Sequence, residues 1–355
     1  MKRKIPGMAF ILATAMFTLL AANASAQYKR TDFVSNQLGV APVQDPSLVN
    51  GWGLSRAATS PFWVSDNITG KATLYTGTGA KVNLVVTIPP ASGNTTGTPT
   101  GTVFNITVGN PTPAFVISKQ TSTGTISAPA LFLFATEDGT ISGWNPNVDP
   151  TNAVIGADRS GSGAVYRGLT IASTPDGDFL YAADNGPNSQ VDVFDATFTL
   201  VKSFTDPDIN GGFAPYGIQE LAGHIWVTFG GNKSASGFVD EFDTDGNLIK
   251  HVAVNGPLHS PWGLALAPAT GFGPFSGALL VANNIPKGRI DAFDPNTGAF
   301  LGVLRDAHGQ AIEIDQLWAI KFGNSGRNGT PEQLFFTAGP NNYANGLFGM
   351  ITFAP

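Results

Sequence analysis

Five large or charged side chains stand at equivalent places along the chain, each directly before a glycine or alanine and an apolar residue. Aromatic faces stack on sugar rings and apolar ligands, and an arginine forks onto a carboxylate or phosphate. If the segments that carry these side chains all begin at one end of a ring, they converge into an aromatic mouth with one cation, which predicts a ligand-binding site. The structural alternative is that the aromatics pack between repeats and the arginine pairs with an acid. The five residues are Trp52, Arg167, Tyr216, Trp262 and Trp318.

The sequence offers few residues for covalent or metal-assisted catalysis. It has no Cys and 4 His, which excludes thiolate chemistry and leaves little for a His-rich metal site. It has neither a Gly-x-Ser-x-Gly nucleophile elbow nor a His-Glu-x-x-His zinc motif. His259, just before Trp262, is the histidine nearest the expected mouth, and it is the weak candidate for a general base. A structural role in a loop is its other interpretation, so the pattern favours binding and leaves enzymatic activity open.

Asp and Asn residues recur after one strand-like run of several repeats. The weak candidate metal ligands among them are Asp66, Asp184 and Asn284, whose hard oxygen atoms would suit Ca²⁺. Such residues are also a common turn device, because their side chains bond nearby backbone groups. The segment 243–247 resembles the start of an EF-hand loop but has Val254 where that loop needs Glu, so we predict a turn there. We expect no cofactor, with Ca²⁺ as the ion to test.

Composition limits the class of protein. With 43 Gly and 25 Pro among 355 residues, the chain is too interrupted for a helical bundle. Hydrophobic residues at 42% and charged residues at 12% exclude a disordered polyelectrolyte. A net charge of -6 argues against nucleic acid as a partner.

The candidate residues are positioned by a repeated unit of four short strands. Each anchor residue opens an inner strand, and a β-branched or aromatic run forms the second strand. An alternating third strand, a turn and a fourth strand follow. Four antiparallel strands at a spacing near the ~40–50 residues of a propeller blade predict an all-β, six-bladed β-propeller. The six second-strand runs are 62–67, 131–136, 180–185, 225–230, 279–284 and 334–339.

The two ends of the chain predict how the ring closes. The sixth unit ends after its third strand, whereas 28–36 is a strand-like segment ahead of the first complete unit. We expect this N-terminal strand to complete the last blade, since closure removes an exposed sheet edge. No boundary is visible within 27–355, which predicts a single propeller domain. The Gly/Thr/Pro-rich stretches 91–101 and 110–127 are expected to be long excursions on the second blade.

Residues 1–26 have the pattern of a secretory signal peptide. Three cations at 2–4 precede the apolar run 8–22, and Ala24-Ser25-Ala26 fits cleavage before Gln27. No later apolar run is long enough to span a bilayer. We therefore predict a secreted protein, periplasmic or extracellular, without a membrane span in the mature chain.

Several motifs resemble those of known propellers. Trp52-Gly53-Leu54, the run 63–67 and the run 288–294 resemble NHL-type six-bladed propellers, and the mature chain resembles a bacterial family of exported propellers of unknown function. A more distant similarity is to gluconolactonase and regucalcin-like propellers, which implies a divalent cation on the axis. In those enzymes an Asn or Asp often precedes the inner-strand glycine. The matching residues in this chain are Trp52, Thr100, Arg167, Tyr216, Trp262 and Trp318.

Three classes of function follow from these patterns. The favoured one is a propeller whose central mouth binds a small molecule, a glycan or a protein partner. The second is a lactonase, lyase or hydrolase that uses a central divalent metal or His259 as general base. The third is an interaction module at the cell surface that uses 91–127 as a contact loop.

Overall fold

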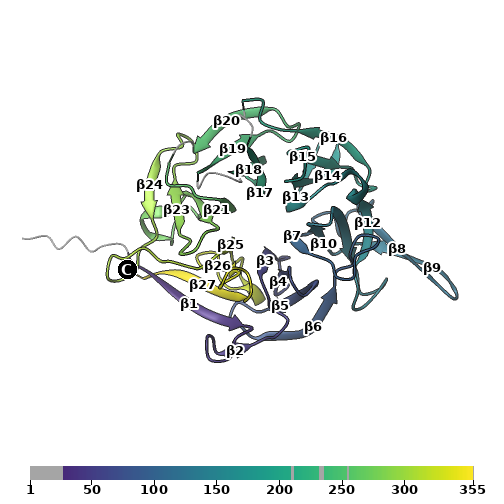
Figure 1. The fold of residues 1–355 in the computed structure, drawn as a ribbon, viewed down its shortest axis with the longest axis horizontal. Helices are drawn as coiled ribbons and strands as arrows, with labels where there is room; N and C mark the ends of the chain where they lie inside the picture. The colour runs from purple at the N-terminus through teal and green to yellow at the C-terminus, as the bar shows by residue number, and fades with distance from the viewer. Residues whose placement is uncertain (1–26, 209–211, 232–235, 254–255, 355) are drawn as a thin grey trace, which may run out of the picture.

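The computed structural model describes residues 27–208, 212–231, 236–253 and 256–354. Six β-sheets are arranged around a common axis, each with one strand nearest the centre (Figure 1). The predicted all-β, six-bladed β-propeller with four-stranded antiparallel blades is therefore confirmed. The predicted signal peptide, residues 1–26, lies outside the described residues.

The strands of the first three blades follow one another along the chain. Blade one contains β3 (Gly51–Ser55), β4 (Phe62–Asp66), β5 (Lys71–Tyr75) and β6 (Lys81–Thr87). Blade two contains β7 (Pro99–Phe104), β10 (Phe132–Thr136), β11 (Thr140–Trp144) and β12 (Val154–Asp158). Blade three contains β13 (Tyr166–Thr174), β14 (Gly177–Asp184), β15 (Gln190–Phe194) and β16 (Leu200–Phe204).

The remaining blades complete the ring. Blade four contains β17 (Phe213–Leu221), β18 (His224–Gly231), β19 (Gly237–Phe242) and β20 (Leu248–Ala253). Blade five contains β21 (Pro261–Leu266), β22 (Leu279–Asn283), β23 (Ile290–Phe293) and β24 (Phe300–Val303). Blade six contains β25 (Leu317–Phe322), β26 (Leu334–Ala338), β27 (Leu347–Ala354) and β1 (Gln27–Ser35). Short 3-10 helices lie at Ser160–Ser162, Gly273–Phe275 and Gly326–Asn328. No helix in the described part of the chain has the length and hydrophobicity of a membrane span.

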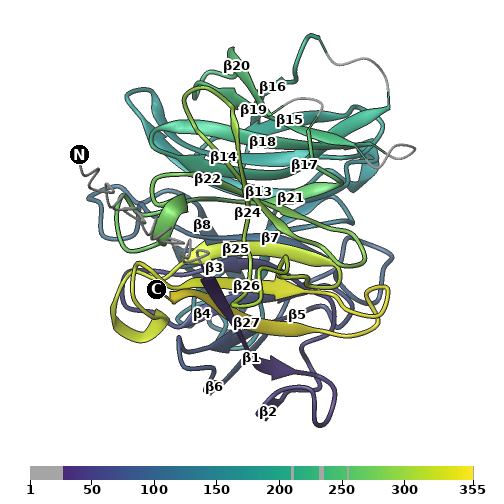
Figure 2. The same cartoon turned by 90° about the vertical axis from the view of Figure 1, so that its left-hand side faces the viewer.

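The N-terminal strand closes the ring, as predicted. β1 pairs antiparallel with β27, from Gln27 opposite Ala354 to Ser35 opposite Leu347. The two strands lie side by side in both views (Figures 1 and 2). A short strand, β2 (Val43–Gln44), pairs parallel to β1 and covers part of its outer edge. The first and last parts of the chain therefore share one sheet.

The second blade departs from its expected loops. The predicted excursion over 110–127 contains a two-stranded hairpin, β8 (Val116–Thr121) and β9 (Gly124–Pro129), which projects from the outside of the ring (Figure 1). The expected stretch 91–101 also overlaps the inner strand β7, which begins at Pro99. Both differences have the same cause, since alternating Val, Ile, Thr and Ser residues pair readily even where Gly and Pro interrupt the chain.

Burial explains the different composition of inner and outer strands. Each blade packs between two others, so the second and third strands are covered on both faces, and every residue of β4 and β10 is buried. The outermost strands have one face on solvent, and β16 and β20 alternate between more and less exposed residues. Apolar runs therefore mark the inside of a blade, and alternation marks its rim.

The glycine that follows most anchor residues is required by close contact between neighbouring blades. A Cβ on Gly217 would lie 1.9 Å from the carbonyl oxygen of Trp262, and one on Gly53 would lie 2.2 Å from that of Thr100. Gly263 is similarly close to the carbonyl of Trp318, at 2.4 Å. The inner strands approach one another too closely here for a side chain. The glycine therefore recurs because the centre of the ring is narrow.

Candidate functional site

The predicted anchor residues are aimed by a recurring irregularity of the inner strand. In every blade, the ladder between the first and second strands shifts register at the anchor, as between Gly51 and Leu54 or between Pro215 and Ile218. A β-bulge of this kind re-aims a side chain out of the regular alternation. The bulge leaves some backbone N–H groups without a partner in the ladder. In blade four a threonine supplies one, since Thr228 Oγ1 accepts from Gly217 N at 2.7 Å. The bulges turn the anchors toward one place on the axis.

The structure brings all five predicted residues together. Trp52 and Trp318 stack with ring centroids 3.7 Å apart, and Trp262 meets both rings edge-on. Tyr216 lies 5.9 Å from Trp318, and the guanidinium of Arg167 lies over Trp52 at 5.5 Å. The five side chains come from blades one, three, four, five and six, so they meet at the axis. We call these residues, together with Tyr343, which packs against Trp318, the aromatic plug.

The faces of the tryptophans are occupied by other protein groups. Trp52, Trp262 and Trp318 are 2%, 8% and 1% exposed. Arg167 Nη1 forms an ion pair with Glu137 Oε1 at 2.9 Å, and both side chains are 26% exposed at the outer edge of the plug. The expected convergence is present, but the rings pack on one another and the arginine pairs with an acid, as in the structural alternative.

Three polar atoms in or next to the plug have no partner among the described residues. Trp52 Nε1, Arg167 Nε and Gln316 Oε1 are buried without a hydrogen bond. By contrast, Trp318 Nε1 donates to Asn50 Oδ1 at 2.8 Å and Trp262 Nε1 donates to the Arg167 carbonyl at 3.0 Å. Buried polar atoms normally have a partner, so the three unbonded atoms indicate a place for water or a polar ligand.

Three residues just before the tryptophans have left-handed backbone. Asn50, Ser260 and Gln316 have φ of 51°, 47° and 52°, which is uncommon for residues with a side chain. Each stands two residues before a plug tryptophan. Their shared conformation shows that these three residues set the turn into the inner strand.

The candidate general base His259 belongs to the same turn region of blade five. Its backbone N–H donates to Asn283 Oδ1 at 2.7 Å. Asp315, which directly precedes Gln316, accepts from the Asn341 N–H at 2.8 Å. These contacts hold loops in place, and a catalytic role for His259 stays a prediction.

The weak metal candidates lie on three different blades. Both oxygens of Asp66 are buried without a hydrogen bond to any described residue, and burial raises the pKa of Asp66 well above its usual value. Asp184 Oδ1 accepts from the backbone of Val165 and Gly186, each at 2.8 Å. Asn284 contacts Leu317 and Tyr343. In the described residues, the one group of three metal-ligating side chains contains neither Asp66 nor Asp184.

The asparagines of the recurring Asp/Asn pairs connect neighbouring blades. Asn67 Nδ2 donates to the Pro99 carbonyl, Asn185 Nδ2 donates to that of Pro215, and Asn284 Nδ2 donates to that of Leu317. Every acceptor is at or near the start of the next blade's inner strand. The motif is thus an inter-blade clip, and the segment at Asp243 is a turn whose Oδ1 accepts from Asp245 N and Asn247 N.

A cavity of about 320 Å³ lies at the other end of the axis, where the inner strands finish. The ends of all six inner strands line it, including Ser55 of β3, Phe104 of β7, Gln219 of β17 and Lys321 of β25. A void of about 20 Å³ between apolar side chains, among them Leu54, lies between the cavity and the plug. The axis therefore has a closed aromatic end and an open polar end.

Two cations and one carboxylate face this axial cavity. Burial lowers the pKa of Lys321 to about 8, and the positive charge of Arg56 adds to the lowering. Lys321 Nζ lies 3.5 Å from Gln219 Oε1, and within the described chain it forms no ion pair. Arg56 Nε donates to the Phe322 carbonyl at 2.7 Å, and burial lowers its pKa to about 10. Glu220 accepts from Gly223 N at 2.7 Å. Both bases are protonated at neutral pH, so the cavity has a net positive charge.

The residues singled out in the sequence did not predict this cavity. Its signal is a lysine near the end of an inner strand whose other residues are apolar or aromatic, Leu317–Phe322. A charged residue inside such a run is unusual enough to be noticed. The anchor residues at the start of each inner strand predicted a site only at the opposite end of the axis.

Comparison with known proteins places the chain in a family. It is 30% identical over 343 residues to the uncharacterized protein R648 of Acanthamoeba polyphaga mimivirus, covering 91% of this chain and 80% of that protein. This chain and the mimivirus protein belong to one family. A second mimivirus protein, L690, is 30% identical over 347 residues, covering 92% of this chain and 86% of its own. These relatives are viral and do not support the bacterial origin expected for the family. No protein-family model matches the chain.

Solved structures share the fold at low identity. The PQQ-bound aldose sugar dehydrogenase of Streptomyces coelicolor aligns with TM-score 0.53 and 12% identity, covering 93% of this chain and 99% of that one. The virginiamycin B lyase of Staphylococcus aureus aligns with TM-score 0.52 and 11% identity, covering 92% and 100%. At such identities the likeness shows the propeller fold alone.

Proposed function

We propose that this protein is a binding propeller whose axial cavity takes a small anionic molecule with a carboxylate or phosphate group. The observation that carries the proposal is Lys321, a largely enclosed cation that forms no ion pair with the described residues and faces a cavity of about 320 Å³ beside Arg56. A cation held out of water is stabilised by an anion that reaches it.

The volume of the cavity limits the ligand. About 320 Å³ is at the lower end of small-molecule sites, which suits a compact acid and excludes a folded protein domain. Arg56 is held by backbone carbonyls on its Nε side, so it supplies a fixed positive field rather than a mobile contact. Lys321 is then the group that contacts the ligand directly, with Gln219 as a neutral neighbour.

The experiment measures binding of phosphate, acetate and succinate by calorimetry to residues 27–355. We expect saturable binding of at least one anion, and at least a tenfold loss in Lys321→Met. Lys29→Met is the matched control, since Lys29 is exposed on β1 and far from the cavity lining. Affinity should also fall as pH rises above about 8, when Lys321 loses its proton. Equal affinity in Lys321→Met, or no binding of any of the three anions, would overturn the proposal.

A second candidate is binding at the aromatic plug, the central mouth expected from the sequence. It is supported by the unbonded atoms Trp52 Nε1, Arg167 Nε and Gln316 Oε1. A glycan or small polar ligand there would displace the Arg167–Glu137 ion pair and bond these atoms. A glycan screen by tryptophan fluorescence tests this, with Arg167→Met expected to abolish any quenching. Arg327→Met, at an exposed position of the 3-10 helix Gly326–Asn328, is expected to preserve it.

Catalysis by a lactonase, lyase or hydrolase mechanism remains the enzymatic alternative. Assays of simple lactones and esters, with and without Ca²⁺, test it directly. Loss of turnover in His259→Gln would support a general base, whereas turnover that survives this change and chelation would remove both predicted routes.

We also propose that the protein is exported and that residues 1–26 are removed. The support is the cationic, apolar and small-residue order of that segment. Mass spectrometry of protein expressed from the full sequence in a bacterial host should find an N-terminus at Gln27 in the periplasmic or extracellular fraction. A retained Met1 in the cytoplasmic fraction would contradict export.

A further inference from the structure

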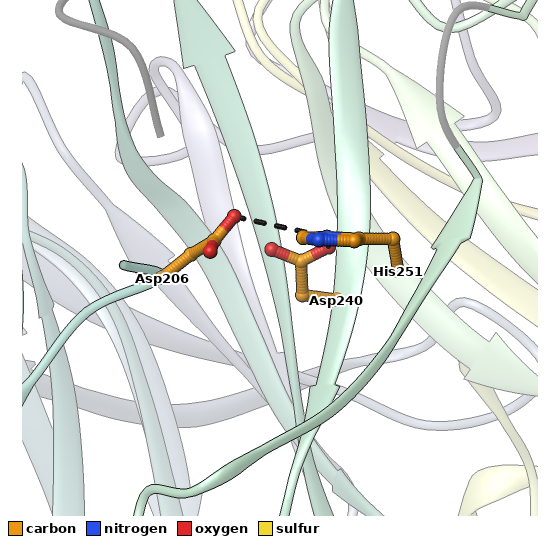
Figure 3. A group of neighbouring side chains, drawn as sticks. All are labelled: Asp206, Asp240 and His251. Atoms are coloured by element: carbon orange, nitrogen blue, oxygen red, sulfur yellow. Dashed lines mark hydrogen bonds and ion pairs between the residues drawn. The ribbon is translucent and has the colours of Figure 1, made fainter. Parts of the chain in front are cut away.

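Three metal-ligating side chains meet near the outer edge of blade four, away from the axis. Asp240 is on β19 and His251 on β20, directly opposite each other in the antiparallel ladder. Asp206 lies in the connection that follows β16 of the neighbouring blade. One potential ligand atom from each residue lies within 4.8 Å of the others. Figure 3 shows the Asp240 carboxylate between the other two side chains.

We propose that Asp206, Asp240 and His251 bind one divalent transition-metal ion, Zn²⁺ or Mn²⁺, which joins blades three and four. This site is separate from the axial cavity and from the aromatic plug, and it does not depend on the proposed function.

The distances fit a shared ion. Ligand atoms bound to one such ion at about 2.0–2.2 Å lie roughly 3–3.6 Å from each other. His251 Nδ1 is 2.9 Å from Asp240 Oδ1 and 3.7 Å from Asp206 Oδ2. All three ligand atoms lie within 4.8 Å of one another, so a shared ion requires the side chains to rotate toward it.

An unbonded oxygen also indicates a missing partner. Asp240 is 0% exposed, and its Oδ2 has no hydrogen-bond partner among the described residues. In Figure 3 one Asp240 oxygen lies beneath the His251 ring and the other faces Asp206. Two facing carboxylates in a buried place are costly, and a cation between them offsets that cost.

The groups around the three residues are arranged as around a metal site. Asp206 Oδ1 accepts from the Asp208 N–H at 2.8 Å, which leaves Oδ2 toward the histidine. His251 Nε2, the ring nitrogen away from Asp240, lies 3.7 Å from Asp208 Oδ2. A metal-bound histidine usually donates its second N–H to a carboxylate, which orients the ring. Asp208 is therefore a positioning residue.

The chemistry of the donors selects the class of ion. Two carboxylates and one imidazole suit Zn²⁺ or Mn²⁺, whereas Ca²⁺ prefers six to eight oxygen ligands. The His251 side chain is 37% exposed, so solvent can complete the coordination. Water would occupy the remaining coordination positions and could be replaced there by small ligands. The main effect of the bound ion is to stabilise the contact between blades three and four.

The test is calorimetric titration of chelator-treated residues 27–355 with Zn²⁺ and with Mn²⁺, and with Ca²⁺ for comparison. We expect one ion per chain for Zn²⁺ or Mn²⁺ and a higher Tm in its presence. Binding should weaken at least 100-fold in His251→Ala and in Asp240→Asn. Asp208→Asn should weaken it about tenfold, as for other outer-sphere partners.

His224→Ala is the matched control. His224 is on β18 of the same blade, partly exposed, and pairs with Glu241 rather than with the cluster. If Asp240→Asn fails to fold, His251→Ala still decides the question, because that side chain is partly exposed. The proposal is overturned if neither ion binds stoichiometrically, if only Ca²⁺ binds, if His251→Ala keeps wild-type affinity, or if His224→Ala loses binding to the same extent.

Discussion

Trp52 of blade one and Trp318 of the neighbouring blade six stack face to face near the axis, with ring centroids 3.7 Å apart and planes 17° from parallel. The two residues open the inner strands of the first and last blades. Their contact therefore joins the two ends of the ring near its centre, while β1 and β27 join them within the outer half of blade six.

Removing one member of this stack should destabilise the whole ring. Trp318→Ala is expected to lower the free energy of unfolding by about 3–5 kcal/mol, because a large buried side chain is lost and the plug cannot collapse fully. Chemical denaturation followed by circular dichroism measures the change. Phe300→Ala, an exposed aromatic on β24, should cost less than about 1 kcal/mol. If both variants lost a similar amount of unfolding free energy, the plug would contribute no more to stability than an exposed aromatic residue.

A methyl group between inner strands should be poorly tolerated. Gly217→Ala places a Cβ 1.9 Å from the Trp262 carbonyl and should cost about 1–3 kcal/mol through forced separation of blades four and five. Gly161→Ala is the control, since nothing lies within 4 Å of its added Cβ. Thermal unfolding compares the two variants. A Gly217→Ala protein as stable as Gly161→Ala would contradict the close packing.

Lys321 should make stability depend on alkaline pH. Its folded pKa of about 8 lies below that of a free lysine, so between that value and about 10.5 the unfolded chain binds more protons. Stability of the wild type relative to Lys321→Met should therefore rise with pH through this window. Below about pH 8 Lys321→Met should be the more stable protein, because a buried charge has been removed. The stability of the wild type relative to Lys29→Met should not change with pH in this window. A stability difference between the wild type and Lys321→Met that stays constant across the window would refute the lowered pKa of Lys321.

The inter-blade clips should contribute measurably to stability. Asn185→Ala removes the hydrogen bond to the Pro215 carbonyl and should lower the free energy of unfolding by about 1 kcal/mol. Asn296→Ala, in an exposed turn between β23 and β24, should change it by less than about 0.5 kcal/mol. Urea denaturation of the two variants provides the measurement. Equal free energies of unfolding for the two variants would mean that water replaces the Asn185 hydrogen bond without loss of stability.

Much of the architecture is a local property of the sequence. The anchors, the apolar second strands and the Asp and Gly turns recur because each blade solves the same packing problem. The strand missing from the sixth unit and the strand-like segment at 28–36 predicted the closure by β1, which the pairing with β27 confirms. The convergence of Trp52, Arg167 and the other anchors follows from the same repetition, since equivalent positions in a ring face one axis.

The remaining features depend on contacts between residues far apart in the chain. That Arg167 pairs with Glu137 and that the tryptophans fill the mouth are decided by bulges and by packing across the axis. The cavity around Lys321 is lined by residues of all six inner strands, and the cluster of Asp206, Asp240 and His251 exists because two blades meet. A repeat in the sequence predicts which positions are equivalent, whereas only the closed ring decides which differing side chains become neighbours.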